Sequence, residues 1–358
     1  MKDFEMIREK SNCFEYGRDG YKVSLDRAIF LAPLAGASEL SFRKICHRLG
    51  AGQVFTELVS ARGIRYSGVE SSWRYLEIDP ENEGKVAIQL FGFDPLDFEY
   101  ACQAILDHPI LSKLTALDIN MGCPVKKVIK TGAGSALMKN PKLAQEIVRV
   151  CRKHMEEAAV PVTCKFRKGF YADENIASEF GKLMIDAGVS LISYHARTQA
   201  QMYSGMSDHK TSAELVKAAR DSGANVPVII NGDISSVDIA KKLLEMTEAD
   251  GVMIGREAMR NPFIFHELAY AFYSEQFEDT NSVEISLNDR LDIAMTHYFD
   301  YVKRVGEDIA SREIKMIFMK YFSYFPMAAK LRTRISGLKN MSDYIEFFSF
   351  VENEIADD

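Results

Sequence analysis

Residues 226–246, VPVIINGDISSVDIAKKLLEM, change character half-way along. The first part, 226–232, is a short run of β-branched and apolar residues that ends in Asn231-Gly232, as a buried strand does. The second part, 235–246, opens with serine, a residue that caps helices, and repeats its apolar residues at helical spacing. A strand followed at once by a helix is the unit from which parallel sheets are built.

The same unit recurs through the first 256 residues. Strand-like runs lie at 28–36, 53–59, 85–91, 116–123, 161–167, 191–197, 226–232 and 250–256. Helical periodicity separates them, most clearly at 140–158, which begins with Asn140 and Pro141. Eight such units in about 230 residues predict an α/β fold, a closed (β/α)8 or TIM barrel. The alternative is an open doubly wound sheet, but residues 32–39, APLAGASE, lack the GxGxxG turn expected after its first strand.

The chain changes again after Asn261-Pro262, where the strand signal ends. Helical patterns with aromatic-rich faces follow at 265–273, 287–305, 312–322 and 341–355, and Pro326 must break or kink a helix. We therefore predict a catalytic barrel domain over residues 1–265, of which 1–25 form an N-terminal extension. A smaller all-helical domain is predicted over residues 266–358.

The composition is that of a globular protein, with 47% hydrophobic and 27% charged residues. No run of about 18 apolar residues occurs, and residues 1–25 hold no signal-peptide core, so we expect a cytoplasmic protein without membrane segments. The six cysteines, at 13, 46, 102, 123, 151 and 164, show no CxxC or zinc spacing. We expect free thiols and a monomer.

The net charge of −7 is unevenly distributed. Residues 266–358 hold 10 Lys and Arg against 17 Asp and Glu, whereas residues 1–265 hold 34 of each. Within the acidic region, residues 312–339 form a basic island with seven positive residues and one negative, Glu313. This island is either a solvated helix face or a contact for nucleic-acid phosphates.

Polar or glycine-rich residues follow nearly every predicted strand. They are Pro33, Leu34, Ala35 and Gly36; Glu57; Gln89; Asn120 and Cys123; Lys165 and Arg167; His195 and Arg197; Asn231, Gly232 and Asp233; and Gly255 and Arg256. The carboxyl ends of barrel strands meet at one rim, where barrel enzymes carry their active sites. We therefore predict an active site at this rim. No further histidine or carboxylate stands at metal-ligand spacing, so we expect no metal.

The last two strands end in NGDI and GR, the place where barrels often bind phosphate. Gly232 and Gly255 let the backbone approach an anion, and Arg256 adds a cation. The alternative for Gly232 is an ordinary turn.

Three other strand ends suggest redox chemistry. Cys123 stands between Gly122 and Pro124 with no histidine nearby, so it suits a general acid better than a nucleophile. Lys165 could neutralise the electron-rich edge of a reduced flavin, or form an internal salt bridge, for example with Glu57. His195 could hydrogen-bond the same ring or a phosphate, or be a satisfied polar residue.

At this point the motifs resemble a known family. APLAG, TELVSARG, VAIQLFG, DINMGCPVKKVIKTGAGSALM, VTCKFRKG, HARTQAQMYSG, VIINGDI and GVMIGREAMRNPFIF occur in order over residues 26–265. Together they resemble the tRNA-dihydrouridine synthases, and most closely the DusB-like branch. The stretch around Cys123 is the most specific of them.

The resemblance implies FMN bound on a TIM barrel, NADPH as the reductant of the flavin, and tRNA as substrate. It implies transfer of hydride to C6 of a uracil and protonation of C5 by Cys123. The implied FMN contacts are Pro33, Leu34, Ala35, Gln89, Lys165, His195, Asn231, Gly232, Asp233, Gly255 and Arg256. Asn120 and Arg197 would face the uracil, and Lys126, Lys127, Lys330, Arg332 and Arg334 would contact RNA.

The chain departs from the family pattern in places. Leu34 stands where methionine is usual, and the stretch 312–322 lacks the Lys-His pair and the tryptophan common in the family's helical domain. Three alternatives stay open: reduction of a free pyrimidine, reduction of uridine in an RNA other than tRNA, and a non-catalytic RNA-binding or chaperone role. The predicted helical domain argues against the first alternative, because an enzyme that reduces a free pyrimidine base needs no domain to dock RNA.

Overall fold

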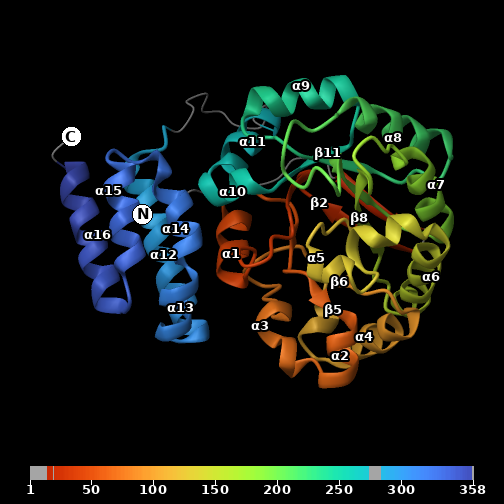
Figure 1. Cartoon of the computed structure of the whole chain (residues 1–358), viewed down its shortest axis with the longest axis horizontal. Helices are drawn as coiled ribbons and strands as arrows, with labels where there is room; N and C mark the ends of the chain where they lie inside the picture. The colour runs from red at the N-terminus through yellow and green to blue at the C-terminus, as the bar shows by residue number, and fades with distance from the viewer. Residues whose placement is uncertain (1–13, 19, 274–283, 357–358) are drawn as a thin grey trace.

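The computed structural model describes residues 14–18, 20–273 and 284–356. Its main body is a parallel barrel, drawn on the right of Figure 1. The strands are β3 (Ile29–Leu31), β4 (Val54–Phe55), β6 (Val86–Phe91), β7 (Ala116–Met121), β8 (Val162–Gly169), β9 (Ile192–Thr198), β10 (Val228–Asn231) and β11 (Gly251–Ile254). They pair in the order β3-β11-β10-β9-β8-β7-β6-β4, and β5 (Val59–Ser60) extends the pairing on β6. The predicted TIM barrel is confirmed.

Backbone hydrogen bonds join the first barrel strand to the second. The N–H of Leu31 donates to the carbonyl oxygen of Gln53 at 2.9 Å, and that of Gly52 donates to the carbonyl of Ile29 at 2.8 Å. These bonds leave the barrel with little exposed edge, which protects it from pairing with other chains.

Helices lie between the barrel strands along the chain and follow the last of them. They are α1 (Leu40–Arg48), α2 (Ala61–Ser67), α3 (Trp73–Leu76), α4 (Pro95–Asp107), α5 (Lys126–Ile129), α6 (Pro141–Glu157), α7 (Ala177–Ala187), α8 (Lys210–Asp221), α9 (Val237–Thr247), α10 (Arg256–Arg260) and α11 (Ile264–Tyr273). The predicted caps are confirmed for two of them. The side chain of Asn140 caps α6, with Pro141 at its first position, and that of Ser236 caps α9.

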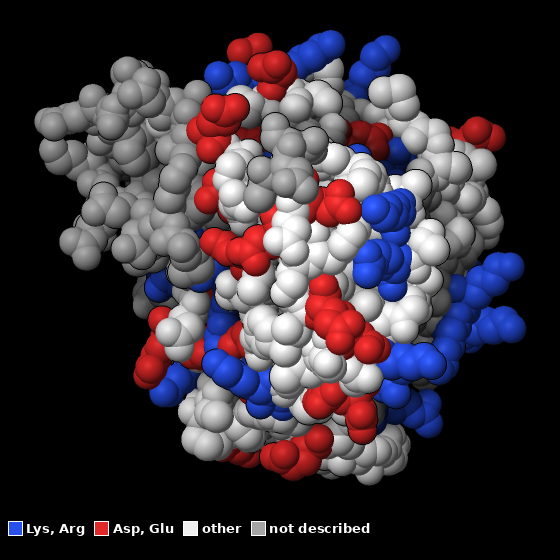
Figure 2. Space-filling view, turned by 90° about the vertical axis from the view of Figure 1, so that its left-hand side faces the viewer, with Lys and Arg blue, Asp and Glu red and all other residues white. Residues whose placement is uncertain are grey.

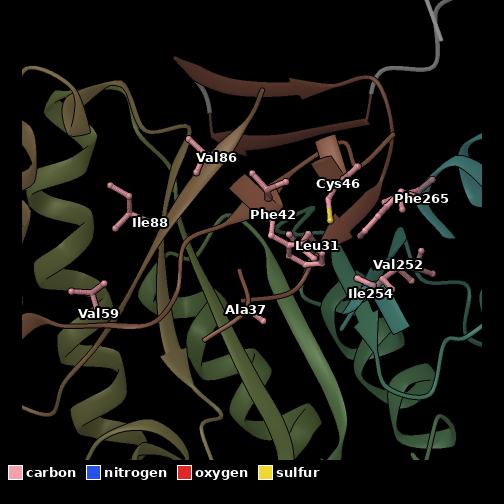
Figure 3. Close-up of a cluster of buried hydrophobic side chains, with 14 of the residues drawn as sticks. Leu31, Ala37, Phe42, Cys46, Val59, Val86, Ile88, Val252, Ile254 and Phe265 are labelled. Atoms are coloured by element: carbon pink, nitrogen blue, oxygen red, sulfur yellow. The ribbon is translucent and has the colours of Figure 1, made fainter. Parts of the chain in front are cut away.

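Two layers of apolar side chains hold the barrel together. The outer layer lies between strands and helices, where Leu31, Val252 and Ile254 lie near Cys46 of α1 and Phe265 of α11 (Figure 3). The inner layer fills the amino-terminal end of the barrel and includes Phe30, Phe55, Ala87, Ala116, Leu191, Ile229 and Met253. These residues fill the barrel interior below the carboxyl ends of the strands.

A hairpin that we did not predict covers the inner layer. Its strands, β1 (Phe14–Arg18) and β2 (Tyr21–Leu25), lie in the predicted N-terminal extension. Tyr16, Val23 and Leu25 of the hairpin pack on the inner layer, and the Tyr16 hydroxyl donates to Gln53 Oε1 at 2.8 Å. The hairpin therefore closes the amino-terminal end of the barrel.

The chain ends in a group of helices beside the barrel, on the left of Figure 1. They are α12 (Leu287–Val305), α13 (Glu307–Glu313), α14 (Lys315–Tyr321), α15 (Ala328–Gly337) and α16 (Met341–Ala356). Aromatic rings form their core, as the predicted faces indicated; Tyr298 and Tyr344, for example, stack at 4.1 Å. Pro326 lies in the break before α15, a helix that we did not predict.

Ionic contacts join the helical group to the barrel. Glu39, the cap of α1, accepts from His297 at 2.8 Å and from Arg304 at 2.6 Å, both on α12. Arg304 also pairs with Glu77 at 2.6 Å. The helix α11, in contrast, packs on α9 and β3 of the barrel, so its contacts lie on the barrel side although the predicted boundary falls at residue 265. Among the described residues, no helix is long and apolar enough to span a membrane.

Candidate active site

The carboxyl ends of the strands surround a cavity of about 650 Å³, a size typical of small-molecule sites. Most predicted site residues line it: Pro33, Leu34, Ala35, Asn120, Cys123, Lys165, His195, Asn231, Gly232, Asp233, Gly255 and Arg256. Met316 and Lys320 of α14 complete the lining from the helical side. The cavity is therefore built by the barrel and the helical group together.

Cys123 lies on a tightly bonded loop after β7. Its N–H donates to Asn120 Oδ1 at 2.9 Å, and its carbonyl oxygen accepts from the N–H and hydroxyl of Ser135 at 3.2 and 2.9 Å. Burial raises the pKa of the Cys123 thiol, and the nearby Arg167 and Lys165 only partly oppose this rise. The thiol is therefore protonated at neutral pH.

Lys165 follows Thr163 on the same face of β8 and ends in the cavity. Its Nζ donates to Asn231 Oδ1 at 3.2 Å, whereas Glu57 accepts from the N–H of Gly36, so the two do not form the alternative salt bridge. Burial lowers the pKa of Lys165 to about 8, with Arg167 adding to the effect. The ammonium group is charged at neutral pH but poorly solvated, which makes it a strong partner for an anion.

The loops after β10 and β11 meet at one end of the cavity. Arg197 binds both carboxylate oxygens of Asp233 at 2.8 and 2.7 Å, and Asp233 also accepts from Arg256 at 3.1 Å. Gly232 has a φ of +122°, and a Cβ there would lie 2.2 Å from the hydroxyl of Ser207. Among the described residues, no hydrogen bond uses the N–H of Gly232, Asp233 or Gly255. This end of the cavity offers backbone donors and a cation to an anion.

His195 and Arg167 also line the cavity. Burial and the surrounding Arg167, Lys165 and Arg197 lower the pKa of His195 far below its ordinary value, so its imidazole is neutral. Arg167 donates through Nε to the carbonyl oxygen of Gly122 at 2.7 Å and thereby supports the cysteine loop. A neutral imidazole can donate one hydrogen bond and accept another.

Comparison with known proteins identifies the family. A family model described as dihydrouridine synthase matches residues 30–355. The chain belongs to the dihydrouridine synthase family. A relative named probable tRNA-dihydrouridine synthase, from Aquifex aeolicus, is 33% identical over 89% of this chain and 94% of its own length. Another, named tRNA-dihydrouridine synthase B, from Pasteurella multocida, is 33% identical over 76% and 77%.

Solved structures show the shared fold. A structure titled as TcOYE with pHBA has a TM-score of 0.51 at 10% identity and covers 73% of this chain and 92% of its own. A 2-naphthoyl-CoA reductase complex has a TM-score of 0.51 at 9% identity, over 70% of this chain and 51% of its own. The predicted family, fold class and oxidoreductase class of this dihydrouridine synthase are confirmed.

Two predicted contact residues do not line the cavity. The Gln89 side chain is fully buried between Asp118 and Asn120. Arg197 is 1% exposed, and its guanidinium group is held by Asp233, Ser207 and Gly205. Direct contact of Arg197 with a substrate base is not supported by this position, and both residues instead brace residues that do line the cavity.

The predicted RNA contacts lie outside the cavity. Lys126 and Lys127 are exposed on α5, beside the cysteine loop. On α15, Lys330 pairs with Glu354 at 3.3 Å, Arg334 lies 3.8 Å from the ring centroid of Phe350, and Arg332 is exposed. Figure 2 shows acidic side chains spread across this end of the molecule, with many basic ones towards the edges. The basic island is therefore not a continuous positive face.

Several cavity residues were missed in the sequence. Tyr203, within the motif HARTQAQMYSG, lies under two guanidinium groups, with Arg256 at 5.0 Å and Arg167 at 5.6 Å from its ring centroid. Arg260 and Lys320 line the cavity and are exposed. Lys320 belongs to the basic island that the sequence analysis identified. Only the packing of α14 shows that Lys320 is the basic residue of this island that lines the cavity. No group of metal-binding side chains occurs within the described residues.

Proposed function

We propose that this protein reduces the C5=C6 bond of uridines in tRNA to give 5,6-dihydrouridine, with FMN as cofactor, NADPH as its reductant and Cys123 as proton donor. One observation carries the proposal: a protonated cysteine, a buried lysine and an anion-binding end line the same cavity. The names of the relatives support tRNA as substrate. A tRNA substrate also implies a cytoplasmic enzyme.

The anion-binding end fits the phosphate of FMN. Within the part of the chain that the structure describes, the N–H groups of Gly232, Asp233 and Gly255 are open to a ligand, and Arg256 lies beside them. Phosphate binding uses donors of this kind. The absence of a Cβ at Gly232 matters because Ser207 already occupies that space. Arg197 and the N–H of Ser207 donate to the Asp233 carboxylate, so its negative charge is partly compensated.

The rest of the cavity fits a flavin ring. Ala32, Pro33 and Leu34 supply an apolar wall, and Lys165 supplies a positive charge elsewhere in the lining. When bound, FMN supplies the hydride for the reduction. The Lys165 ammonium group is suited to stabilise negative charge on the ring edge. Gln89 acts behind this lining by holding Asn120, which in turn holds the cysteine loop.

Cys123 is suited to deliver the proton that completes the reduction. A donor must be protonated before the reaction and lie next to the atom that gains the proton. The raised pKa of its thiol meets the first condition, and its place in the cavity lining supports the second, because a uracil bound in the cavity could reach it. Arg167, Ser135 and Asn120 fix its loop, so the thiol is held ready.

The cavity mouth is suited to a nucleic acid. Arg256, Arg260 and Lys320 are exposed cations on its lining. Its two carboxylates are paired: Asp233 with Arg197 and Arg256, and Glu257 with Arg260 and Tyr324. Positive charge at the mouth favours a polyanion. Lys126 and Lys127 extend this charge beside Cys123. We also propose that the protein acts as a monomer and binds no metal.

The proposal is tested by mapping dihydrouridine in tRNA from cells with and without the gene. The expected result is loss of dihydrouridine at particular tRNA positions and its return with the wild-type gene. An unchanged dihydrouridine map would contradict the tRNA assignment. Loss confined to another RNA, or activity only on free pyrimidines, would favour the alternatives stated above.

A further inference from the structure

A buried carboxyl group that the proposed reaction does not use lies below the cavity. The Asp118 side chain is fully buried, and strand pairing places Gln89 and Thr163 directly beside it. Gln89 Nε2 donates to Asp118 Oδ2 at 2.6 Å, and Thr163 Oγ1 donates to Oδ1 at 2.5 Å. Burying a carboxylate without hydrogen-bond donors costs folding free energy, and these two donors offset that cost for Asp118.

A chain of hydrogen bonds leads from Asp118 to the cysteine loop. Gln89 Oε1 accepts from Asn120 Nδ2 at 2.8 Å. Asn120 Oδ1 accepts from the N–H of Gly122 at 3.2 Å and from that of Cys123 at 2.9 Å. The chain thus connects the interior of the barrel to the backbone of Cys123.

The direction of each bond in this chain is determined. Backbone N–H groups only donate, so Asn120 must turn its oxygen towards Cys123 and its NH2 group towards Gln89. Gln89 must then turn its own NH2 group away from Asn120, towards residue 118. A carboxylate only accepts, so aspartate at this position satisfies the last donor. An apolar residue would leave the Gln89 NH2 group buried without an acceptor.

We propose that Asp118 is a positioning residue for Cys123, acting through Gln89 and Asn120 on the backbone of the cysteine loop. The inference rests on the role of Cys123 in the proposed function. Without the carboxylate, Gln89 loses its anchor and holds Asn120 less firmly, so the loop gains freedom. A catalytic group displaced by about 1 Å can cost roughly 100-fold in rate. We therefore expect kcat to fall by about 10- to 100-fold, with little change in KM for RNA.

The test compares two substitutions in the full-length, flavin-loaded protein. Asp118→Leu removes the acceptor and keeps the branching of the side chain, at a larger volume. Asp118→Asn keeps an oxygen for Gln89 and turns its NH2 group to Thr163, whose hydroxyl can rotate and accept. The matched control is Tyr16→Phe, which removes another buried hydrogen bond, to Gln53, at the opposite end of the barrel.

Two readouts separate an effect on positioning from an effect on general stability. The first is the pair of kinetic constants kcat and KM. The second is the rate at which iodoacetamide alkylates Cys123, measured by peptide mass spectrometry at several pH values. The Asp118→Leu protein is expected to lose kcat and to show an altered alkylation profile. Asp118→Asn should stay close to wild type. Tyr16→Phe should lower the melting temperature but leave the alkylation profile unchanged.

A wild-type kcat and alkylation profile in Asp118→Leu would overturn the inference, as would an equal change in Tyr16→Phe. If Asp118→Leu does not fold, Gln89→Met interrupts the same chain at its next link and is judged by the same two outcomes. If instead Cys123 is not the proton donor of the proposed function, the Cys123→Ala protein would keep full activity. An inactive Cys123→Ala together with a wild-type-like Asp118→Leu would overturn this inference alone.

Discussion

At the scale of single residues, Lys165 shows how burial prepares a charge for binding. The group lies among other cations and has only one hydrogen-bond partner, Asn231 Oδ1, within the described part of the chain. Its lowered pKa means that the protein spends folding free energy to keep this ammonium group out of water. A negatively charged or electron-rich ligand recovers that free energy when it binds.

A pH prediction for FMN binding follows from Lys165. The ammonium charge is complete well below a pKa of about 8 and is lost as the pH rises through that value. FMN affinity should therefore be highest below this pH and weaken above it. In Lys165→Met the affinity should be lower and this part of the pH dependence absent. Titration of FMN fluorescence against protein at several pH values measures both, and an equal pH dependence in the variant would contradict the assignment.

Single residues also show how far sequence reasoning reaches. Cys123 and Lys165 were predicted because they stand at strand ends, where the fold itself determines which way a side chain faces. Gln89 and Arg197 stand at strand ends too, but neighbouring side chains hold them away from the cavity. Such pairings depend on three-dimensional neighbours that no local pattern records.

At the scale of elements, the loop after β10 combines strain with close approach. Gly232 combines a φ of +122° with a neighbour, Ser207, that leaves no space for a side chain. Gly223 has a similar backbone preference, with a φ of +68°, but nothing lies within 4 Å of its missing Cβ. The two glycines therefore compare a positive φ alone, at Gly223, with a positive φ and crowding together, at Gly232.

Gly232→Ala should destabilise the protein more than Gly223→Ala does, and it alone should reduce FMN retention. Backbone strain costs about 1–2 kcal/mol for a residue with a side chain in the left-handed region, and we expect Gly223→Ala to show only that cost. Thermal unfolding and the FMN content after gel filtration measure the two effects. Equal losses in both variants would show that the Gly232 loop does not hold the phosphate.

The elements themselves were predicted unevenly, for a physical reason. The eight barrel strands and the long helix α12 have strong periodicity and clear boundaries, and all were found. The β1–β2 hairpin and α15 were not. The hairpin is short and stabilised by the barrel interior, and α15 follows Pro326 with a weak apolar pattern, so tertiary contacts rather than local sequence determine both.

At the scale of the whole molecule, the junction between barrel and helical group depends on a buried ionic cluster. Arg304 bridges Glu39 and Glu77. Burial alone would raise the pKa of Glu39, but His297 and Arg304 together lower it to about 2. The junction determines how α14 faces the cavity, and with it the place of Lys320.

Arg304→Ala should destabilise the protein by about 3 kcal/mol, because it removes one of the two cationic partners of the buried Glu39 carboxylate. Arg152→Ala, which removes a surface ion pair with Glu156, should cost less than about 1 kcal/mol. The contribution of Glu39 is complete above its ordinary pKa of 4.5 and is lost as the pH falls towards about 2. Chemical unfolding over this pH range tests both statements, and equal losses in the two variants would contradict the account of the junction.

The RNA surface also belongs to this scale. Neutralising Arg260 and Lys320 should weaken tRNA binding and reduce the slope of log affinity against log salt by about two, roughly one for each phosphate that is no longer neutralised. Neutralising Lys330, Arg332 and Arg334 is expected to weaken binding less, because none of these three residues lines the cavity. Filter binding at several salt concentrations compares them. A larger effect of substituting the α15 residues would instead indicate that RNA binds over α15, away from the cavity mouth.

The central claim is that Cys123 completes a flavin-dependent reduction of uridine in tRNA. The most direct measurement is the yield of dihydrouridine when flavin-loaded protein and NADPH are incubated with tRNA that lacks it. We predict that the wild-type protein forms dihydrouridine and that Cys123→Ala is slower by roughly 10² to 10⁴ while it keeps its flavin. Cys46→Ala, at a buried cysteine of the core, is the control and should be unaffected. A flavin-loaded wild-type protein that forms no dihydrouridine, or a Cys123→Ala protein as fast as wild type, would contradict the claim.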